Sequence, residues 1–352
     1  MNGLRRHHRK IGTAIALAVV VVTFGFVLPR IADYREVWDV ISALEPVWVA
    51  ALLVATVANV LTYAPPWMIA LPGLRFPQAL AFTQASTAVT FALPGGGLVG
   101  MAGSFALLKS WSFPTQDVAR AVTLTGIWNQ LANLLLPVVA VVLVAAESEA
   151  DSHLTTLAFV GGTIFGVVAL AIGLVLWRED LAQAIGDLAA RASNRVLRAF
   201  RRGPVRWSGA AFARFQVETV GLLRRRWHVL TLAAIVGNLA VFAVLLVALR
   251  AGGVGASEVT WIEAFAAWSI ARVMGLIPLT PGGLGVIELG LSAVLVGFGG
   301  PNAEVVAAVL IYRFLTLVPT LVLGGLTMLV WRRLHPFDGA GGDAREESAR
   351  PR

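Results

Sequence analysis

Long apolar segments separated by short polar turns follow one another along the chain. A helix needs about 20 apolar residues to cross the hydrocarbon core of a bilayer. The pattern predicts spanning helices over the segments 11–28, 47–71, 118–145, 154–177, 227–249 and 303–331. Segment 29–46 is more polar and has apolar residues three and four positions apart on one face, which predicts a short helix at the membrane interface.

Two further apolar segments, 78–110 and 258–300, contain helix breakers near their middle. The first is interrupted at Pro94–Gly100 and the second at Pro281–Gly285. Irregular backbone at membrane depth is tolerated only where protein covers it or where it lines a water-filled cavity. We therefore expect each segment to form two short helices that meet at a buried break, either as a re-entrant hairpin or as two tilted helices.

The composition supports this interpretation. Hydrophobic residues make up 57% of the 352 residues and charged residues 14%, whereas soluble domains carry about 25% charged residues. We expect an all-α fold, a polytopic membrane helical bundle of about eight membrane elements that include the two broken or re-entrant hairpins. The sequence has no cysteine, which excludes disulfides and a cysteine nucleophile. No histidine is spaced for metal binding, and we expect neither a metal nor a cofactor.

Positive charge sets the expected orientation in the membrane. The net charge of +8 is almost all arginine, and arginine-rich segments stay on the cytoplasmic side. Both basic ends of the membrane region and a basic amphipathic loop at 178–226 should therefore face the cytoplasm of the cell (inner) membrane. This orientation requires segment 78–110 to enter and leave on the cytoplasmic side and segment 258–300 to do so on the outer side.

The two broken segments resemble each other. The first reads F-A-L-P-G-G-G-L-V-G from Phe91 and the second reads P-L-T-P-G-G-L-G-V-I from Pro278, so that Pro94 matches Pro281. A short polar turn and a long helix with a proline and mid-helix polar groups follow in both. Because their orientations are opposite, we predict an inverted repeat, an arrangement in which transporters place the substrate site where the breaks meet. A chance match between two P-G-G turns is the alternative.

Two arginines and a glutamate lie within the apolar helices. Arg272 precedes the second break, Glu288 follows it, and Arg313 lies in the last span. A central arginine costs about 2.5–3.5 kcal/mol, so both arginines should face the bundle interior and contact an acid or a ligand phosphate. Arginine suits phosphate because its planar fork donates two parallel hydrogen bonds. A purely structural ion pair or triad among the three residues is the other interpretation, and both stay open.

The breaks and the helices beside them supply further candidates. Exposed amides at the glycine clusters and at the next helix N-terminus can hold an anionic headgroup. Mid-helix amides are alternatively interhelical hydrogen-bond partners, and a lysine at a helix end can reach toward the interface. We expect no catalytic residue. The candidate residues for binding lipid or substrate are Arg272, Glu288, Arg313, Pro281, Gly282, Gly283, Gly285, Gly95, Gly96, Asn129, Gln130 and Lys109.

At P-L-T-P-G-G-L-G-V-I-E the sequence resembles the lysylphosphatidylglycerol synthase transmembrane family, also called flippase-like integral membrane proteins. The L-P-G-G-G-L-V-G break, the I-Y-R-F-L-T segment and the basic loop extend the resemblance over roughly 10–332. Larger members of the family carry a soluble aminoacyl-transferase domain and move aminoacylated phospholipid between leaflets. Here we expect a transmembrane domain at 1–332, no transferase domain, and a disordered cytoplasmic tail at 333–352. The first break departs from the family pattern, with Gly100–Met101 and Lys109 where a Gly-Glu followed by an arginine is common.

These patterns predict a function in lipid movement. We expect an integral membrane protein, not an enzyme, that translocates a phospholipid or polyprenyl-linked lipid between leaflets, with the headgroup in a polar cavity. The alternatives are a small-solute or ion-coupled transporter and a non-transporting scaffold for a transferase. Expected partners are anionic membrane phospholipids, and a transferase or a second copy of the chain. Nucleic acid is not expected, because aromatic residues are sparse among the arginines of the basic loop.

Overall fold

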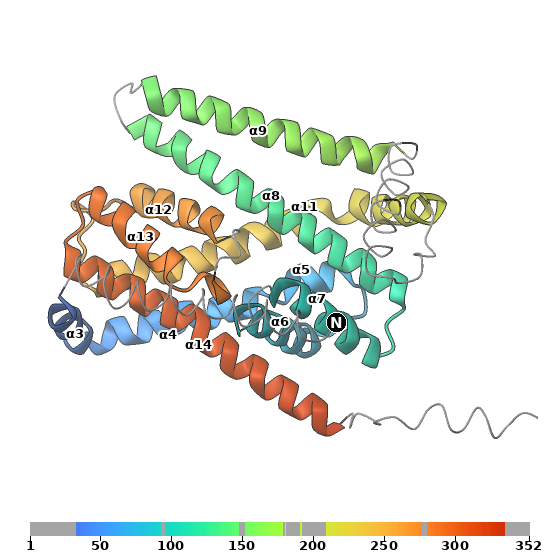
Figure 1. The fold of residues 1–352 in the computed structure, drawn as a ribbon, viewed down its shortest axis with the longest axis horizontal. Coiled ribbons are helices and arrows are strands. Elements are labelled where there is room, and N and C mark those ends of the chain that lie inside the picture. The colour runs from blue at the N-terminus through green and yellow to red at the C-terminus, as the bar shows by residue number, and fades with distance from the viewer. Residues whose placement is uncertain are drawn as a thin grey trace, which may run out of the picture.

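Every regular element of the described residues is a helix. The computed structural model describes residues 33–92, 96–147, 152–178, 209–275 and 280–334, together with 180 and 191. The predicted helix at 11–28 and the tail beyond residue 334 lie outside this part of the chain. The elements shown in Figure 1 are α3 (Tyr34–Ser42), α4 (Pro46–Thr62), α5 (Pro65–Ala70), α6 (Phe76–Ala92), α7 (Gly96–Ser110), α8 (Thr115–Glu147), α9 (Ser152–Trp177), α11 (Gly209–Ala251), α12 (Trp261–Met274), the 3-10 turn η2 (Pro281–Gly283), α13 (Val286–Gly297) and α14 (Asn302–Leu334).

Four helical segments have the length and apolar composition needed to cross a membrane. They are Pro46–Ala70, Thr115–Glu147, Arg225–Ala251 and Asn302–Trp331. Many of their large apolar side chains are exposed, including Val54, Leu232 and Leu329. Such exposure is costly in water but expected for positions that contact lipid. The prediction of a polytopic helical membrane bundle is therefore confirmed.

Two predicted helix boundaries differ from the structure. The segment expected to be one helix at 47–71 is divided into α4 and α5 before Pro65 and Pro66, because proline lacks the N–H that would continue the helix. The helix predicted at 227–249 begins earlier, because α11 already begins at Gly209 within the basic segment 178–226 and continues into the apolar span, which starts at Arg225. Alanine, leucine and arginine are strong helix formers, so the loss of hydrophobicity before residue 227 does not end the helix.

Helix α3 confirms the short helix expected between 29 and 46, and its apolar face packs on the beginning of α14. Asp33 caps its N-terminus by accepting a hydrogen bond from the Arg35 N–H at 2.8 Å. On one side of α3 Val37 is buried against Ala303, while on the other Trp38 is exposed. This division is the one expected of a helix at a membrane surface.

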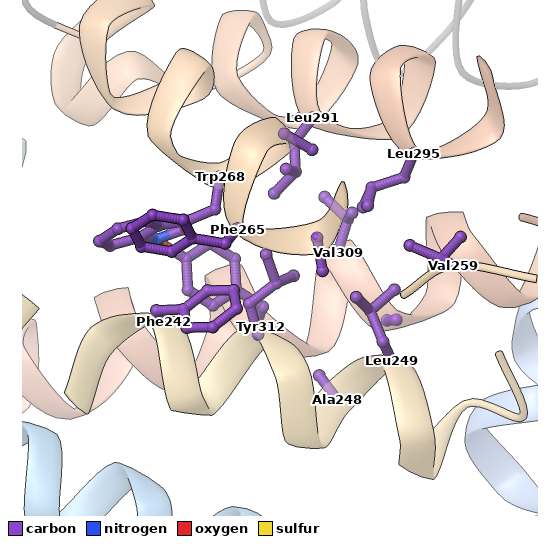
Figure 2. Packing of buried hydrophobic residues seen from close by; sticks show 14 of the residues in the cluster. Phe242, Ala248, Leu249, Val259, Phe265, Trp268, Leu291, Leu295, Val309 and Tyr312 are labelled. Carbon is purple, nitrogen blue, oxygen red and sulfur yellow. The ribbon is translucent and has the colours of Figure 1, made fainter. Parts of the chain in front are cut away.

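The two larger hydrophobic clusters lie mainly in different halves of the bundle. The larger joins α11, α12, α13 and α14 around an aromatic group (Figure 2). In it the ring of Phe242 lies 5.1 Å from that of Phe265 and 5.6 Å from that of Trp268. The Trp268 indole N–H donates to the Tyr312 hydroxyl at 3.2 Å, which satisfies a buried donor. The second cluster joins α5, α6, α7 and α8, and includes Phe82.

Each broken segment forms a pair of helices, and the first helix of each pair also packs on a long helix from the other half of the chain. Helix α6 packs against α7 and α12 against α13, while α6 also packs on α14 and α12 on α8. Helices α4 and α11 pack on each other, and α9 lies at the edge of the bundle beside α8 (Figure 1). The second break contacts the end of α6, because a Cβ added at Gly282 would lie 3.4 Å from the Cβ of Phe91.

Candidate functional site

The second break is built from glycines in conformations that other residues rarely adopt. Gly282 has φ +61° and Gly285 has φ +85°, in the left-handed region that costs about 1–2 kcal/mol per residue with a Cβ. Gly283 lies between them, and the Thr280 hydroxyl donates to the Leu284 carbonyl at 2.8 Å. The chain therefore turns sharply from η2 into α13, which brings the N-terminus of α13 close to α14.

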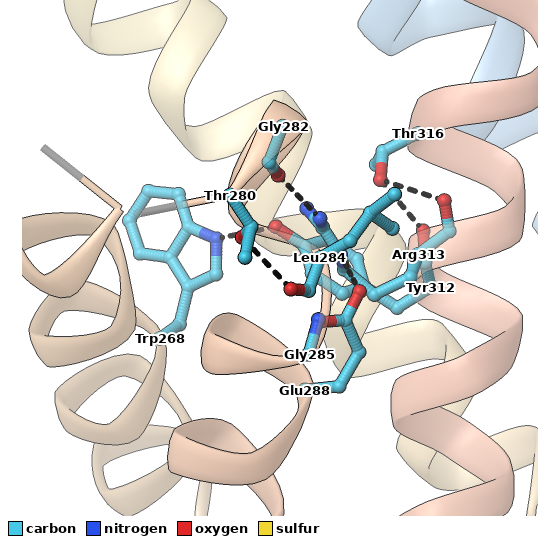
Figure 3. A network of polar contacts seen from close by, with 9 residues as sticks. All are labelled: Trp268, Thr280, Gly282, Leu284, Gly285, Glu288, Tyr312, Arg313 and Thr316. Carbon is cyan, nitrogen blue, oxygen red and sulfur yellow. Dashed lines mark hydrogen bonds and ion pairs between the residues drawn. The ribbon is translucent and has the colours of Figure 1, made fainter. Parts of the chain in front are cut away.

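A buried ion pair fastens this turn to α14 (Figure 3). Arg313 donates from Nε to Glu288 Oε1 at 2.6 Å and from Nη2 to the Gly282 carbonyl at 2.7 Å. The second carboxylate oxygen, Glu288 Oε2, accepts from the Gly285 N–H at 2.7 Å. Only 1% of Glu288 and 8% of Arg313 are exposed. Both carboxylate oxygens are thus occupied, and the pair acts as a clamp on the break.

Arg272 does not join this clamp, so the expected trio of Arg272, Glu288 and Arg313 is reduced to a pair. The Arg272 guanidinium donates from Nε and Nη2 to Asn133 Oδ1 on α8, at 3.2 and 2.9 Å. Its Cζ lies 5.1 Å from the centre of the Trp268 ring, a cation–π contact. Among the described residues no acid lies within ion-pair distance of Arg272. Its charge is held in place but not neutralised.

A cavity of about 390 Å³ lies beside Arg272, between the two halves of the bundle. Binding pockets for small molecules usually range from about 300 to 1,000 Å³. The cavity is lined by Thr62, Tyr63, Pro66, Trp67, Ser86, Thr87, Met101, Ser104, Val122, Thr125, Gly126, Trp128, Asn129, Ala233, Ala234, Gly237, Asn238, Val241 and Arg272. Arginine is the one charged side chain in this set, and hydroxyls and amides make up most of the rest of the polar surface.

The structure places the other candidate residues at different distances from this cavity. Asn129 lines it. Gln130 does not, and its Oε1 accepts a hydrogen bond from Asn133 Nδ2 at 3.3 Å. Lys109 is exposed at the end of α7 and donates to the Thr115 hydroxyl at 2.7 Å, outside the lining. Gly96 begins α7, and Gly95 lies outside the described residues.

Several lining residues were not among the sequence candidates. Tyr63, Thr87 and Trp128 line the cavity, and the Trp128 indole N–H donates to Thr231 on α11 at 2.9 Å. Isolated hydroxyls in apolar helices are also common at helix–helix contacts. No sequence signal therefore separated these residues from packing residues. Only the proximity of α4, α6 and α8 in the fold identifies them.

The fold and the site define a class: a polytopic helical membrane protein with two broken helix pairs and a polar cavity between its spans. A comparison with protein families shows which family of this class the chain belongs to. Residues 12–324 match the family described as the lysylphosphatidylglycerol synthase TM region, and the chain belongs to it. This confirms the resemblance seen at the second break. A search of curated proteins found no match.

Proposed function

We propose that this protein moves a phospholipid or polyprenyl-linked lipid between the leaflets of the inner membrane. The headgroup occupies the cavity beside Arg272 while the tails stay in the bilayer. One observation carries the proposal: an intramembrane arginine without an acidic partner among the described residues lines a cavity large enough for a headgroup. Ionisable groups inside membranes are costly and usually mark substrate pathways. The protein acts as a transporter and not as an enzyme.

We further propose that the two halves are an inverted repeat whose broken segments are re-entrant hairpins. The packing supports this, because exchanging α4 with α11, α6 with α12, α7 with α13 and α8 with α14 preserves several of the main helix contacts, although among the described residues the contact of α11 with α14 has no counterpart between α4 and α8. Under this exchange the contact of α6 with α14 corresponds to the contact of α12 with α8, and the contact of α4 with α11 is unchanged. The contact between Gly282 and Phe91 brings the second break against the last turn of α6, which leads into the first break, and this fits the arrangement.

Charge supports an orientation with both termini in the cytoplasm. The arginine-rich segment before α11 and Arg332 and Arg333 at the end of α14 are expected to stay inside. In this orientation the C-terminal end of the α4–α5 span, the first half of α8 and the first half of the α11 span face the cytoplasm. Their residues line the cavity. The described conformation is then open toward the cytoplasmic leaflet, and anionic phospholipids there are the expected partners. Assembly with a transferase or a second copy belongs to the same proposal.

The other candidate functions differ in their structural requirements. A scaffold needs only a packed interior in which both arginines are satisfied internally. Arg313 meets this condition through Glu288 and Gly282, but Arg272 keeps three N–H donors without a hydrogen-bond partner among the described residues. The cavity and these donors favour transport. A solute carrier is distinguished by its cargo, because it would move a water-soluble anion and leave lipids in place.

Transport of labelled lipid in proteoliposomes tests the proposal. The wild type should exchange fluorescent phospholipid between leaflets above the rate of protein-free vesicles. Arg272→Ala removes charge-assisted hydrogen bonds and should slow exchange by roughly tenfold or more. Arg75→Ala is the matched control, because Arg75 is exposed in the turn before α6 and does not line the cavity. Background rates of the wild type across several headgroups would contradict the proposal.

A further inference from the structure

The charge of the cavity lining is unbalanced. Arg272 is the only permanently charged group among the lining residues, and none of them is an aspartate, a glutamate or a histidine. Arginine does not lose its proton in proteins, so the positive charge is permanent. Arg272 is partly buried, and a partly desolvated charge without an opposite charge beside it is less well stabilised than a paired one. An anion entering the cavity therefore completes an interaction that the described residues leave open.

The geometry of Arg272 decides how that anion binds. Asn133 Oδ1 accepts the Nε–H and one Nη2–H, so it occupies the side edge of the guanidinium. The end edge, formed by Nη1 and the other Nη2–H, has no partner among the described residues. Asn133 and the Trp268 ring fix the plane of the group. Two parallel N–H groups in a fixed plane match two oxygens of a phosphate.

Neutral polar side chains complete the lining. Ser86 and Ser104 each donate to the Gly100 carbonyl, at 3.1 and 2.9 Å, so these hydroxyls are already engaged. Thr87 and Asn129 line the cavity without a side-chain hydrogen bond to any described residue. They can bind hydroxyl or sugar groups of a headgroup. They offer no negative charge to a cation.

An ammonium group has no favourable position in this cavity. Glu288, the buried acid at the second break, is absent from the lining and has both oxygens occupied by Arg313 and the Gly285 N–H. An ammonium would therefore face the guanidinium of Arg272 without a counter-charge. Like charges across an interface are strongly unfavourable and serve to reject the wrong partner.

We propose that the cavity selects phosphate-bearing lipid headgroups that lack an amine. This inference rests on the proposed function and names its substrate class. The phosphate could belong to a glycerophospholipid or to a polyprenyl phosphate, because Arg272 would recognise both by the same chemistry.

Headgroup competition in proteoliposomes tests the selectivity. Phosphatidylcholine vesicles carry trace amounts of one tail-labelled lipid: phosphatidylglycerol, a polyprenyl phosphate, phosphatidylethanolamine or lysylphosphatidylglycerol. The wild type should exchange at least one of the two amine-free lipids about tenfold or more faster than the two amine-bearing lipids. Comparison of the two amine-free lipids identifies the source of the phosphate. Equal exchange of all four would overturn the selectivity and leave the proposed function standing, whereas no exchange of any lipid would overturn the proposed function itself.

A charge substitution in the lining provides the second arm. Asn129→Asp adds a carboxylate of nearly the same shape, so it should slow the amine-free lipids and speed the amine-bearing ones. Asn302→Asp is the matched control, because it makes the same substitution at an exposed position at the start of α14 and should leave the preference unchanged. An unaltered preference in Asn129→Asp would contradict the inference.

Binding supplies a readout that needs neither transport nor the Asp variant. Short-chain phosphatidylglycerol should raise the Tm of the detergent-solubilised full chain more than short-chain phosphatidylethanolamine does, because a ligand that binds only the folded state stabilises it. Arg272→Ala should abolish the difference between the two lipids. Equal shifts with both lipids in the wild type would count against the selectivity.

Discussion

At the scale of residues, two arginines that look equivalent in the sequence have different surroundings. Arg313 is neutralised by Glu288 and tied to the Gly282 carbonyl, whereas Arg272 is oriented by an amide and remains charged. A buried arginine needs a partner, and this requirement predicted an acid or a phosphate for both arginines, with Glu288 among the candidates, but not which arginine pairs with it. It could not predict Asn133 as the partner of Arg272. An amide oxygen accepts the hydrogen bonds of a guanidinium without neutralising its charge, and the sequence offers many amides and acids that could do so.

Removing one member of the Glu288–Arg313 ion pair should destabilise the fold more than replacing both members by apolar residues. Glu288→Gln leaves Arg313 buried without its counter-charge, and loss of one member of a buried pair costs about 3–5 kcal/mol. The double variant Glu288→Leu with Arg313→Leu removes both charges and should recover part of that loss. Thermal unfolding in detergent measures both. Glu45→Gln, at an exposed acid before α4, is the control and should leave the Tm unchanged; a single variant as stable as this control would contradict the clamp.

At the scale of elements, the hydrophobic pattern was sufficient for the helices and insufficient for the cavity. Apolar runs placed α8, α9 and α14 to within a few residues, because lipid and core both require apolar surface. The breaks followed from proline and glycine. The cavity depends instead on which helices become neighbours. Thr87 on α6 and Asn129 on α8 lie far apart in sequence, and nothing local in either segment indicates that both face one space.

Close packing of α6 on α14 gives an element-scale prediction. A Cβ added at Gly324 would lie 2.4 Å from the Gln84 carbonyl oxygen and 2.5 Å from the Ala88 Cβ, so the helices would have to separate. Gly324→Ala should therefore lower stability by about 1–3 kcal/mol, as overpacking usually does. The adjacent Gly325 has no atom within 4 Å of an added Cβ, and Gly325→Ala should leave the Tm unchanged or slightly raised. Equal Tm values for the two variants would contradict this packing.

At the scale of the whole molecule, related positions in the two halves have different surroundings. Ser104, Val122 and Thr125 line the cavity. The residues at the same separation from Pro281 as these are from Pro94 are Leu291, Val309 and Tyr312, all in the large hydrophobic cluster. At these positions the first half of the proposed repeat lines the cavity, whereas the related positions of the second half belong to the packed aromatic core. Transporters built from inverted repeats alternate between such states by exchanging the conformations of their halves.

Gln84 is the residue on which this exchange can be tested. Gln84 lies ten residues before Pro94, close to the position that corresponds to Arg272, which lies nine residues before Pro281. Gln84 is 1% exposed, and neither atom of its side-chain amide makes a hydrogen bond to a described residue. Burial of an unpaired amide is unfavourable, and in a transporter it is explained if Gln84 lines the cavity of the opposite state. Because the chain has no cysteine, Gln84→Cys introduces a single thiol. It should react with an impermeant thiol reagent applied from the outer side while lipid is being transported.

The control for this measurement lies on the same helix. Ala79→Cys is equally buried but belongs to the cluster of α5 to α8, away from the contact between the two breaks, and should stay protected. Since the Gln84 amide makes no hydrogen bond to a described residue, its replacement removes no hydrogen bond, and the variant should fold and transport. Reaction of Gln84→Cys only from the cytoplasmic side, or equal protection of both thiols during transport, would mean that the halves do not exchange. The cavity beside Arg272 would then serve the cytoplasmic leaflet alone.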